Sequence, residues 1–137
     1  MTAQVRVLVD ADNVAPVRLR PLLDVLADVG VAIELTASGR PSALDAVTWP
    51  DGAQLLAHAG WQRADAALAD AYQPADVPLI LVSGDGDFGL LAQRHPGPVL
   101  VISAAASSRL RDAAMVVDPA TEGVEPVRAW LRAHVRG

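Results

Sequence analysis

Short runs of continuous apolar residues alternate with helical patterns along most of this chain. The clearest runs, rich in valine, leucine and isoleucine, cover residues 5–9, 79–82 and 99–102. Over residues 19–29, leucine and valine recur every three or four positions, which is the spacing of one helix face. Strands that are apolar throughout are buried on both faces, so the alternation predicts a parallel sheet between helices. The expected fold class is α/β: a three-layer sandwich of one domain over residues 1–137, with five to six mostly parallel strands.

The same pattern predicts where each element lies. The predicted strands cover residues 5–9, 31–36, 53–58, 79–82 and 99–102, with a short sixth at 115–117. The predicted helices cover residues 16–29, 44–47, 63–72, 88–94, 107–113 and 122–135. Gly30 is expected to end the first helix, because glycine accepts the left-handed backbone that follows many helices. Pro21 lacks an N–H group, so the first helix is expected either to kink there or to begin near it.

Composition limits the chemistry that is available to this chain. It contains no cysteine and no lysine, which excludes disulfides, thiolate metal sites and lysine-based catalysis. No apolar run approaches the ~20 residues of a membrane span, and the first ten residues lack a signal-peptide pattern. A cytoplasmic location is therefore expected. A net charge of −5 is unlike that of most nucleic-acid binders, although cations bound at an acidic site would offset it.

Two acidic turns follow the first and fourth predicted strands. The first is Asp-Ala-Asp-Asn at residues 10–13, and the second is Ser-Gly-Asp-Gly-Asp at residues 83–87. Ligands bind at the carboxyl ends of strands in open α/β sheets, at the point where the strand order reverses. We therefore expect the first and fourth strands to be neighbours, with Asp10 and Asp85 converging on one crevice. Clustered carboxylates are costly unless a cation or a proton neutralises them.

The residues of these turns differ in how far local structure explains them. Asp10 directly follows its strand and Asp85 stands three residues before the expected helix, so we interpret both as site residues. Asn13 and Asp87 also suit the N-caps of the helices that follow them. Ser83 either orients a carboxylate or a phosphate, or ends its strand with a local hydrogen bond.

The helix predicted over residues 63–72 offers further candidates. Asp65 shares a stripe with the apolar Leu68, and a carboxylate on such a stripe needs a partner. Asp70 points about 140° away from that stripe and is expected to be an exposed acid. Arg63 fits either a phosphate contact or an exposed cation.

Carboxylates without cysteine are typical ligands of hard cations, so Mg²⁺ or Mn²⁺ is the expected metal. Two such ions about 3.5–4 Å apart can activate water and stabilise the leaving oxygen of a phosphodiester. His58, His95 and His134 are expected to lie at the surface rather than to bind metal. Arg18, Arg40, Arg63 and Arg109 are equal candidates for contacts with a phosphate backbone.

Three sequence blocks, in order and at matching spacing, carry a resemblance to a known family. They are Asp-x-x-Asn at residues 10–13, a basic residue with two aspartates at 63–70, and Ser-Gly-Asp-x-Asp-Phe at 83–88. Together they resemble the NYN domain, a branch of the PIN-like ribonuclease superfamily, over roughly residues 4–118. The chain departs from the family at Arg63-Ala64, where Lys-Gly is usual, and at Ala114-Met115, where Ala-Asp is frequent.

The resemblance implies a PIN-like sandwich with strand order 3-2-1-4-5 and metal-dependent cleavage of RNA. By position, it makes Asp10, Asp65, Asp85 and Asp87 the catalytic residues that hold Mg²⁺ or Mn²⁺. It gives Asn13 a role in orienting the site or contacting substrate, with Ser83, Arg63, Asp12 and Asp70 as substrate or supporting residues. RNA is the expected partner, homodimer formation stays open, and no membrane partner is expected.

Two alternatives come from other functional classes. Asp10-Ala-Asp12-Asn-Val14 also resembles the first motif of phosphatases of the haloacid dehalogenase type. Asp10 would then be a nucleophile and Asp12 a general acid, but that mechanism usually needs a lysine, which this chain lacks. The second alternative is a non-catalytic module that binds RNA or protein. The net acidity and Met115 favour this module, whereas the intact carboxylates count against it.

Overall fold

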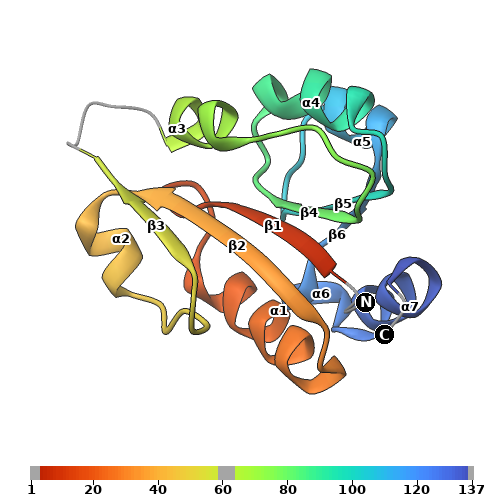
Figure 1. Cartoon of the computed structure of the whole chain (residues 1–137), viewed down its shortest axis with the longest axis horizontal. Coiled ribbons are helices and arrows are strands. Elements are labelled where there is room, and N and C mark those ends of the chain that lie inside the picture. Colours follow the sequence, from red (N-terminus) through yellow and green to blue (C-terminus); the bar gives the residue numbers. More distant parts are fainter. Residues whose placement is uncertain (1–3, 59–63, 136–137) are drawn as a thin grey trace.

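One parallel sheet forms the centre of the computed structural model, which describes residues 4–58 and 64–135, except the side chains of 64 and 65 (Figure 1). Within this part of the chain, the strands are β1 (Gln4–Asp10), β2 (Ala32–Gly39), β3 (Gln54–Ala57), β4 (Leu79–Val82), β5 (Val99–Ile102) and β6 (Met115–Val117). Their order is β3-β2-β1-β4-β5-β6, and all neighbouring pairs are parallel. The predicted α/β class, the strand order and the pairing of the first and fourth strands are confirmed.

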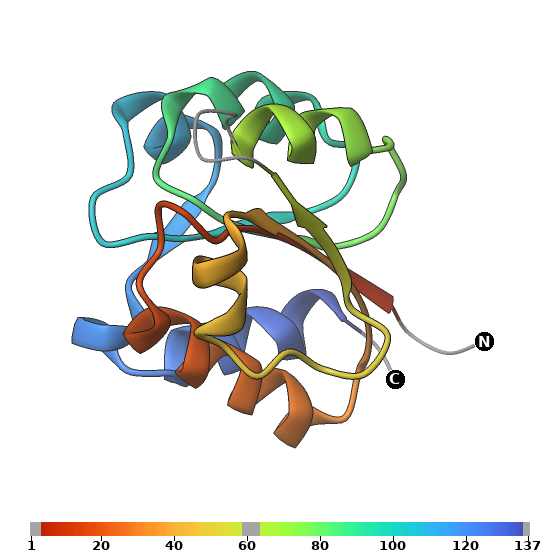
Figure 2. The same ribbon diagram turned by 90° about the vertical axis from the view of Figure 1, so that its left-hand side faces the viewer.

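Helices cover both faces of the sheet, as Figures 1 and 2 show. One face carries α1 (Pro16–Val29), α2 (Pro41–Asp45), α6 (Pro119–Glu122) and α7 (Glu125–His134). The other carries α3 (Ala64–Ala71), the 3₁₀ turn η1 (Gly86–Phe88), α4 (Gly89–Arg94) and α5 (Ser108–Ala113). Among the described residues, no helix has the length and apolar character to cross a membrane.

The chain changes faces between its first half and its second half. The helices that follow β1 and β2 lie on one face, whereas those that follow β3, β4 and β5 lie on the other. The loops that leave the carboxyl ends of the neighbouring strands β1 and β4 therefore diverge to opposite sides. A crevice opens at such a reversal of strand order, which is where α/β proteins of this type bind ligands.

The sheet supports a separate hydrophobic core on each face. Val5, Val7 and Val9 of β1 pack with the leucines of α1 and with Trp130 of α7. On the opposite face, Leu8 joins a cluster that includes Leu68, Leu81, Phe88 and Leu110. Successive residues of a strand point to opposite faces, so an unbroken apolar run supplies both cores at once.

One helix prediction needs correction, and one alternative for Pro21 is excluded. The helix predicted over residues 122–135 begins only at Glu125, as α7, because Gly123 has a positive φ of 77° that no helix accommodates; residues before it form the separate α6. Pro21 lies inside α1, which begins at Pro16 and ends at Gly30 in the left-handed conformation. The leucines on either side of Pro21 are buried in the core, so tertiary packing offsets the hydrogen bond that proline cannot make.

His95 is buried, which corrects its expected surface position. Its Nε2 lies 2.6 Å from the carbonyl oxygen of Val77, and its Nδ1 lies 2.7 Å from the hydroxyl oxygen of Tyr72. The histidine thus joins the end of α4 to the loop between α3 and β4. Burial raises the pKa of Tyr72 above its ordinary value, and the nearby Arg6 guanidinium opposes part of that rise.

The two-sided core makes a specific prediction about stability. Leu81 on the central strand β4 is fully buried, and Leu81→Ala should lower the free energy of unfolding by about 2–5 kcal/mol. Leu90 on α4 is 54% exposed, and Leu90→Ala should change the free energy of unfolding by no more than about 0.5 kcal/mol. Urea denaturation of the two variants measures both values, and equal losses would contradict this placement of the core.

Candidate functional site

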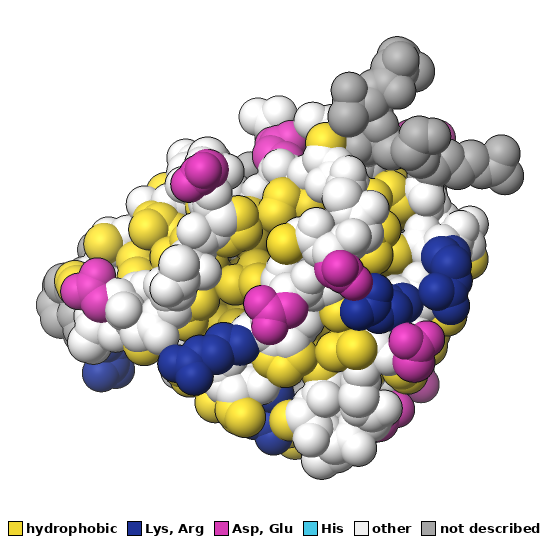
Figure 3. Space-filling view, turned by 90° about the horizontal axis from the view of Figure 1, so that it is seen from below, with side chains coloured by type: hydrophobic (Ala, Val, Ile, Leu, Met, Phe, Trp, Pro, Cys, Tyr) yellow, Lys and Arg dark blue, Asp and Glu magenta, His cyan; other side chains and the backbone are white. Residues whose placement is uncertain are grey.

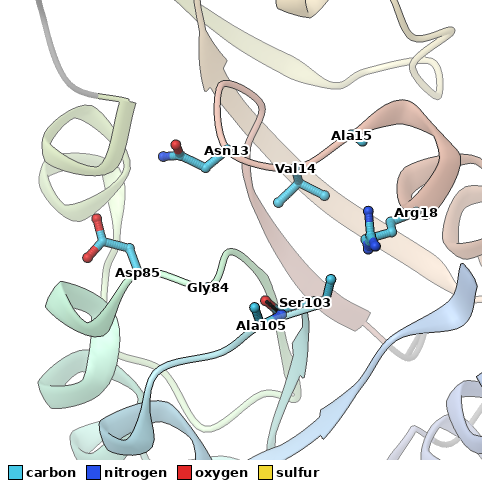
Figure 4. Close-up of a pocket in the computed structure, with 9 residues that line it drawn as sticks. Asn13, Val14, Ala15, Arg18, Gly84, Asp85, Ser103 and Ala105 are labelled. Carbon is cyan, nitrogen blue, oxygen red and sulfur yellow. Dashed lines mark hydrogen bonds between the residues drawn. The ribbon is translucent and has the colours of Figure 1, made fainter. Parts of the chain in front are cut away.

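A cavity of about 370 Å³ opens at the carboxyl edge of the sheet, where β1 and β4 diverge (Figure 4). Three loops form it: those that follow β1, β4 and β5. Its lining consists of Asn13, Val14, Ala15, Arg18, Gly84, Asp85, Ser103, Ala104 and Ala105. The two predicted acidic turns therefore meet at the crevice where they were expected. They contribute Asn13 and Asp85 directly to its wall.

A polar row lies behind this cavity, on the sheet face under α3, α4 and α5. Asp10 is aligned with Ser38 of β2. The register of β1 on β4 places Ser83 beside Asp10, and that of β4 on β5 places Ser103 beside Ser83. All four side chains are buried. The apolar face thus turns polar near the carboxyl ends of these four strands, with one carboxylate among three hydroxyls.

Within the described part of the chain, the side chains of Asn13 and Ser83 hold the Asp10 carboxylate in place. The Nδ2 of Asn13 donates a hydrogen bond of 2.6 Å to its Oδ2, and the hydroxyl of Ser83 donates one of 3.2 Å to the same oxygen. Ser83 also accepts a hydrogen bond of 3.1 Å from the backbone N–H of Asp85. One hydroxyl therefore connects the end of β1 to the turn after β4, and Ser83 makes both the carboxylate contact and the local hydrogen bond that the sequence left as alternatives.

Asn13 does not cap the first helix. The N-cap of α1 is Ala15, which has no side-chain cap hydrogen bond, and the amide of Asn13 is directed to Asp10 instead. Between the two interpretations of Asn13, the geometry favours the one in which it orients the site. Figure 4 shows Asn13 and Asp85 at the same end of the cavity.

Asp85, and not Asp87, is the helix cap in the second turn. Its Oδ1 accepts a hydrogen bond of 2.9 Å from the backbone N–H of Asp87, and Asp85 is the N-cap of η1. The sequence assigned the cap to Asp87 because the helix was expected to begin at Phe88, whereas the 3₁₀ turn begins earlier. Asp87 itself is exposed on η1.

Asp12 is held away from Asp10 by neighbours on the far side of its turn. Its Oδ1 accepts a hydrogen bond of 2.8 Å from the backbone N–H of Arg40, and its Oδ2 lies 3.3 Å from the Nε2 of His58. The His58 side chain is only 6% exposed, which corrects its expected surface position. The carboxylate thus ties the loop after β1 to the ends of β2 and β3. This arrangement does not favour a general acid at Asp12, as the phosphatase alternative requires.

The glycine in the second turn has a steric reason. A Cβ atom added to Gly84 would lie 2.7 Å from the Ser103 hydroxyl and 3.2 Å from the carbonyl oxygen of Ala105. The loops after β4 and β5 therefore approach too closely for any side chain at this position.

The third predicted block lies only partly within the described structure. Arg63 and the side chain of Asp65 are outside the described residues, and Asp70 is exposed on α3, as expected. In the part of the chain that is described, no three residues among histidine, aspartate and glutamate are grouped closely enough to hold a metal ion. The predicted ligand set of Asp10, Asp65, Asp85 and Asp87 stays a prediction.

The oxygen donors at these two strand ends are of the kind that a hard cation binds. Asp10, Asn13 and Ser83 are in contact through their side chains, Asp85 follows Ser83 and lines the cavity, and the chain has no thiolate to compete with them. Mg²⁺ commonly binds one or two protein carboxylates and completes its coordination with water and substrate phosphate. The residues present therefore fit Mg²⁺ or Mn²⁺.

Among the candidate arginines within the described part of the chain, Arg18 is the one that lines this cavity. Its Nε donates a hydrogen bond of 3.1 Å to Oδ1 of Asp118, the N-cap residue of α6. Arg109 lies on α5, with its side chain against Gly86 and Gly89, and it lines a different hollow between α4 and α5. Arg40 is exposed after β2.

Comparison of the sequence with models of known protein families finds no match, and comparison with curated proteins finds none either. The parallel sheet and its strand order are compatible with a PIN-like fold. The functional argument therefore rests on the α/β topology and on the acidic turns at its switch point.

The Ser83 bridge can be tested through stability. Ser83→Ala removes the donor to Asp10 and the acceptor for the Asp85 amide, and should lower the free energy of unfolding by about 1–3 kcal/mol. Ser108→Ala removes an exposed hydroxyl on α5 and should cost no more than about 0.5 kcal/mol. Urea denaturation compares the two, and a neutral Ser83→Ala would mean that the bridge contributes nothing to the fold.

Proposed function

We propose that this protein is a metal-dependent ribonuclease of the NYN type, which hydrolyses RNA phosphodiester bonds. The observation that carries the proposal is that Asn13 and Ser83 hold the Asp10 carboxylate at the end of β1, while Ser83 also accepts a hydrogen bond from the backbone N–H of Asp85 after β4. These residues lie beside a cavity at the switch point of the sheet, and the strand order is that expected for the fold. The three sequence blocks add the family resemblance.

Each residue has a distinct part in the proposed reaction. Asp10 and Asp85 would hold one or two divalent cations, with Asp65 and Asp87 as further ligands or ligand-positioning residues. When bound, the cation supplies Lewis-acid polarisation of the phosphodiester and activation of the attacking water. Asn13 and Ser83 fix the Asp10 carboxylate, so that its orientation is set before substrate arrives.

The burial of Asp10 supports a functional role for its carboxylate. The residue is fully buried, and removal of a carboxylate from water costs several kcal/mol unless hydrogen bonds and a cation compensate. Asp10 aligns with serine hydroxyls on both neighbouring strands, where apolar residues would pack at lower cost. A buried polar cluster that lowers stability in this way, at the switch point of the sheet, is typical of a functional site.

The direct test is cleavage of labelled single-stranded RNA in the presence of Mn²⁺. Asp10→Asn and Asp85→Asn should each lower the rate by about 100-fold or more, because cation stabilisation of the transition state is worth several kcal/mol. Asparagine preserves the shape of both side chains, and it caps helices as well as aspartate does. Asp24→Asn, an exposed position on α1, makes the same change in charge and should cleave at the parental rate.

Equal cleavage by the parent and both site variants would remove the proposed roles of Asp10 and Asp85. Absence of cleavage by the parent, with RNA binding retained in the presence of a chelator, would assign the protein to the non-catalytic alternative. Release of phosphate from a small phosphoester with RNA left intact would favour the phosphatase alternative.

Metal binding can be measured without any substrate. A cation that binds only the folded protein at 100 times its Kd adds about 2.7 kcal/mol of stability, roughly 8 °C in Tm for a chain of this length. Mn²⁺ should therefore raise the Tm of the parent and of Asp24→Asn, and most of that rise should be absent in Asp10→Asn. An identical rise in all three proteins would place the manganese elsewhere.

A further inference from the structure

The cavity beside the acidic turns has two chemically different ends. Asp85 and Asn13 lie at one end, and Arg18 of α1 lies at the other, as Figure 4 shows. Val14 lies between them on one side, with Ser103 and Ala105 opposite. Arg18 is the one basic residue among those that line the cavity. A ligand that spans the cavity would therefore contact the Asp85 carboxylate at one end and the Arg18 guanidinium at the other.

Arg18 is fixed by one edge of its guanidinium group. Its Nε donates to Oδ1 of Asp118, a residue that also accepts hydrogen bonds from the backbone N–H of Ala120 and the hydroxyl of Thr121. The Arg18 side chain is 24% exposed. A guanidinium has five N–H donors, and this contact uses one of them. Asp118 thus sets the direction of the Arg18 side chain, and the Nη groups of Arg18 remain at the cavity.

The surroundings of Arg18 favour a phosphate as its ligand. A planar guanidinium matches two oxygens of a phosphate at once, which makes arginine a preferred residue for phosphate recognition. Figure 3 shows that arginine and acidic side chains are interspersed on the face covered by α1 and α7, without a basic patch. One example is Arg128, which pairs with Asp28 at 2.7 Å. The cation at the cavity is therefore placed locally rather than as part of a basic surface.

We propose that this cavity holds one nucleotide of the substrate strand next to the scissile bond, with Arg18 binding its phosphate. This inference rests on the proposed ribonuclease function, because the acidic end of the cavity is taken as the place of cleavage. The volume of about 370 Å³ falls at the lower end of the range for small-molecule pockets and suits a single nucleotide. Arg18 is a substrate-binding residue in this arrangement.

The same lining predicts little preference for a base at this nucleotide. The amide of Asn13 is directed to Asp10, and the hydroxyl of Ser103 accepts a hydrogen bond from the N–H of Ala105. The remaining walls are the small apolar side chains of valine and alanine. A phosphate contact positions a strand without reading its sequence, so binding should tolerate all four bases here.

Nuclear magnetic resonance tests the phosphate contact independently of catalysis. The wild-type protein, labelled with ¹⁵N, is titrated with adenosine 5′-monophosphate and, separately, with adenosine. The nucleotide should shift the Arg18 Nε resonance and the amides of Ala104 and Ala105, and adenosine should leave the Arg18 resonance in place. Equal shifts with both compounds, or no shift at Arg18 at millimolar nucleotide, would overturn the proposal.

Kinetics on single-stranded RNA test the same contact in the proposed reaction. Arg18→Gln should raise KM about tenfold and change kcat little, because it removes a charged hydrogen bond to phosphate. The slope of log affinity against log salt concentration should fall by about 0.7, the value for one phosphate contact on a single strand. Arg18→Lys should recover part of the loss. Arg132→Gln, an exposed position on α7 with the same change in charge, should match the parent.

The outcomes separate this inference from the proposed function. If the parent cleaves RNA and Arg18→Gln has parental KM and salt dependence, the phosphate site is wrong and the nuclease stands. If the parent does not cleave RNA but adenosine monophosphate shifts the Arg18 resonance, the nuclease is wrong and the phosphate site stands. Circular dichroism and urea denaturation of Arg18→Gln identify any loss that comes from the broken Asp118 contact, and Arg18→Lys then decides between charge and fold.

Discussion

The parallel pairing of β1 with β4 is the constraint on which the rest of the molecule depends. It brings the first strand of the chain beside the fourth, and the helices that follow the two strands leave on opposite faces. The crevice between the diverging loops is a geometric consequence of that reversal. Ser83 fixes the pairing at its carboxyl end, since its hydroxyl joins Asp10 to the backbone of Asp85. Fold and candidate site therefore share one set of contacts, and neither can shift without the other.

The site illustrates how a small α/β domain can accommodate a buried carboxylate. Asp10 is fully buried between Ser38 of β2 and Ser83, which follows β4, so polar groups of the protein take the place of water around the acid. Asn13 adds the shortest of the hydrogen bonds to it. The neighbouring acids are distributed to other tasks: Asp12 holds the ends of β2 and β3 through Arg40 and His58, and Asp85 caps η1. Asp12 and Asp85 thus have hydrogen-bond partners of their own, which offset part of the repulsion between neighbouring carboxylates.

The two different ends of the cavity would orient an RNA strand in the proposed reaction. The acidic end of the cavity faces the proposed cation site, and its far end carries Arg18, which is anchored to Asp118, the N-cap residue of α6. An RNA strand that crosses it would place one phosphate at the site of cleavage and a neighbouring phosphate at the guanidinium. A chain with a net charge of −5 can bind a polyanion through such local placement of charge, because screening confines each contact to about 8–10 Å. Overall acidity and RNA binding are therefore compatible.

Sequence periodicity by itself determined the architecture of this protein, because continuous apolar strands alternating with amphipathic helices have few ways to bury both sheet faces. The general rule that sites lie where the strand order reverses placed Asp10 and Asp85 at neighbouring strand ends, and the family resemblance supplied the strand order. Only the tertiary structure decided what each polar side chain contacts. The pairing of Asp12 with His58 spans 46 residues, and the choice of Arg18 over other arginines depends on Asp118, 100 residues away. Such contacts carry no local signal in the sequence, because they depend on the packing of distant loops rather than on residue spacing.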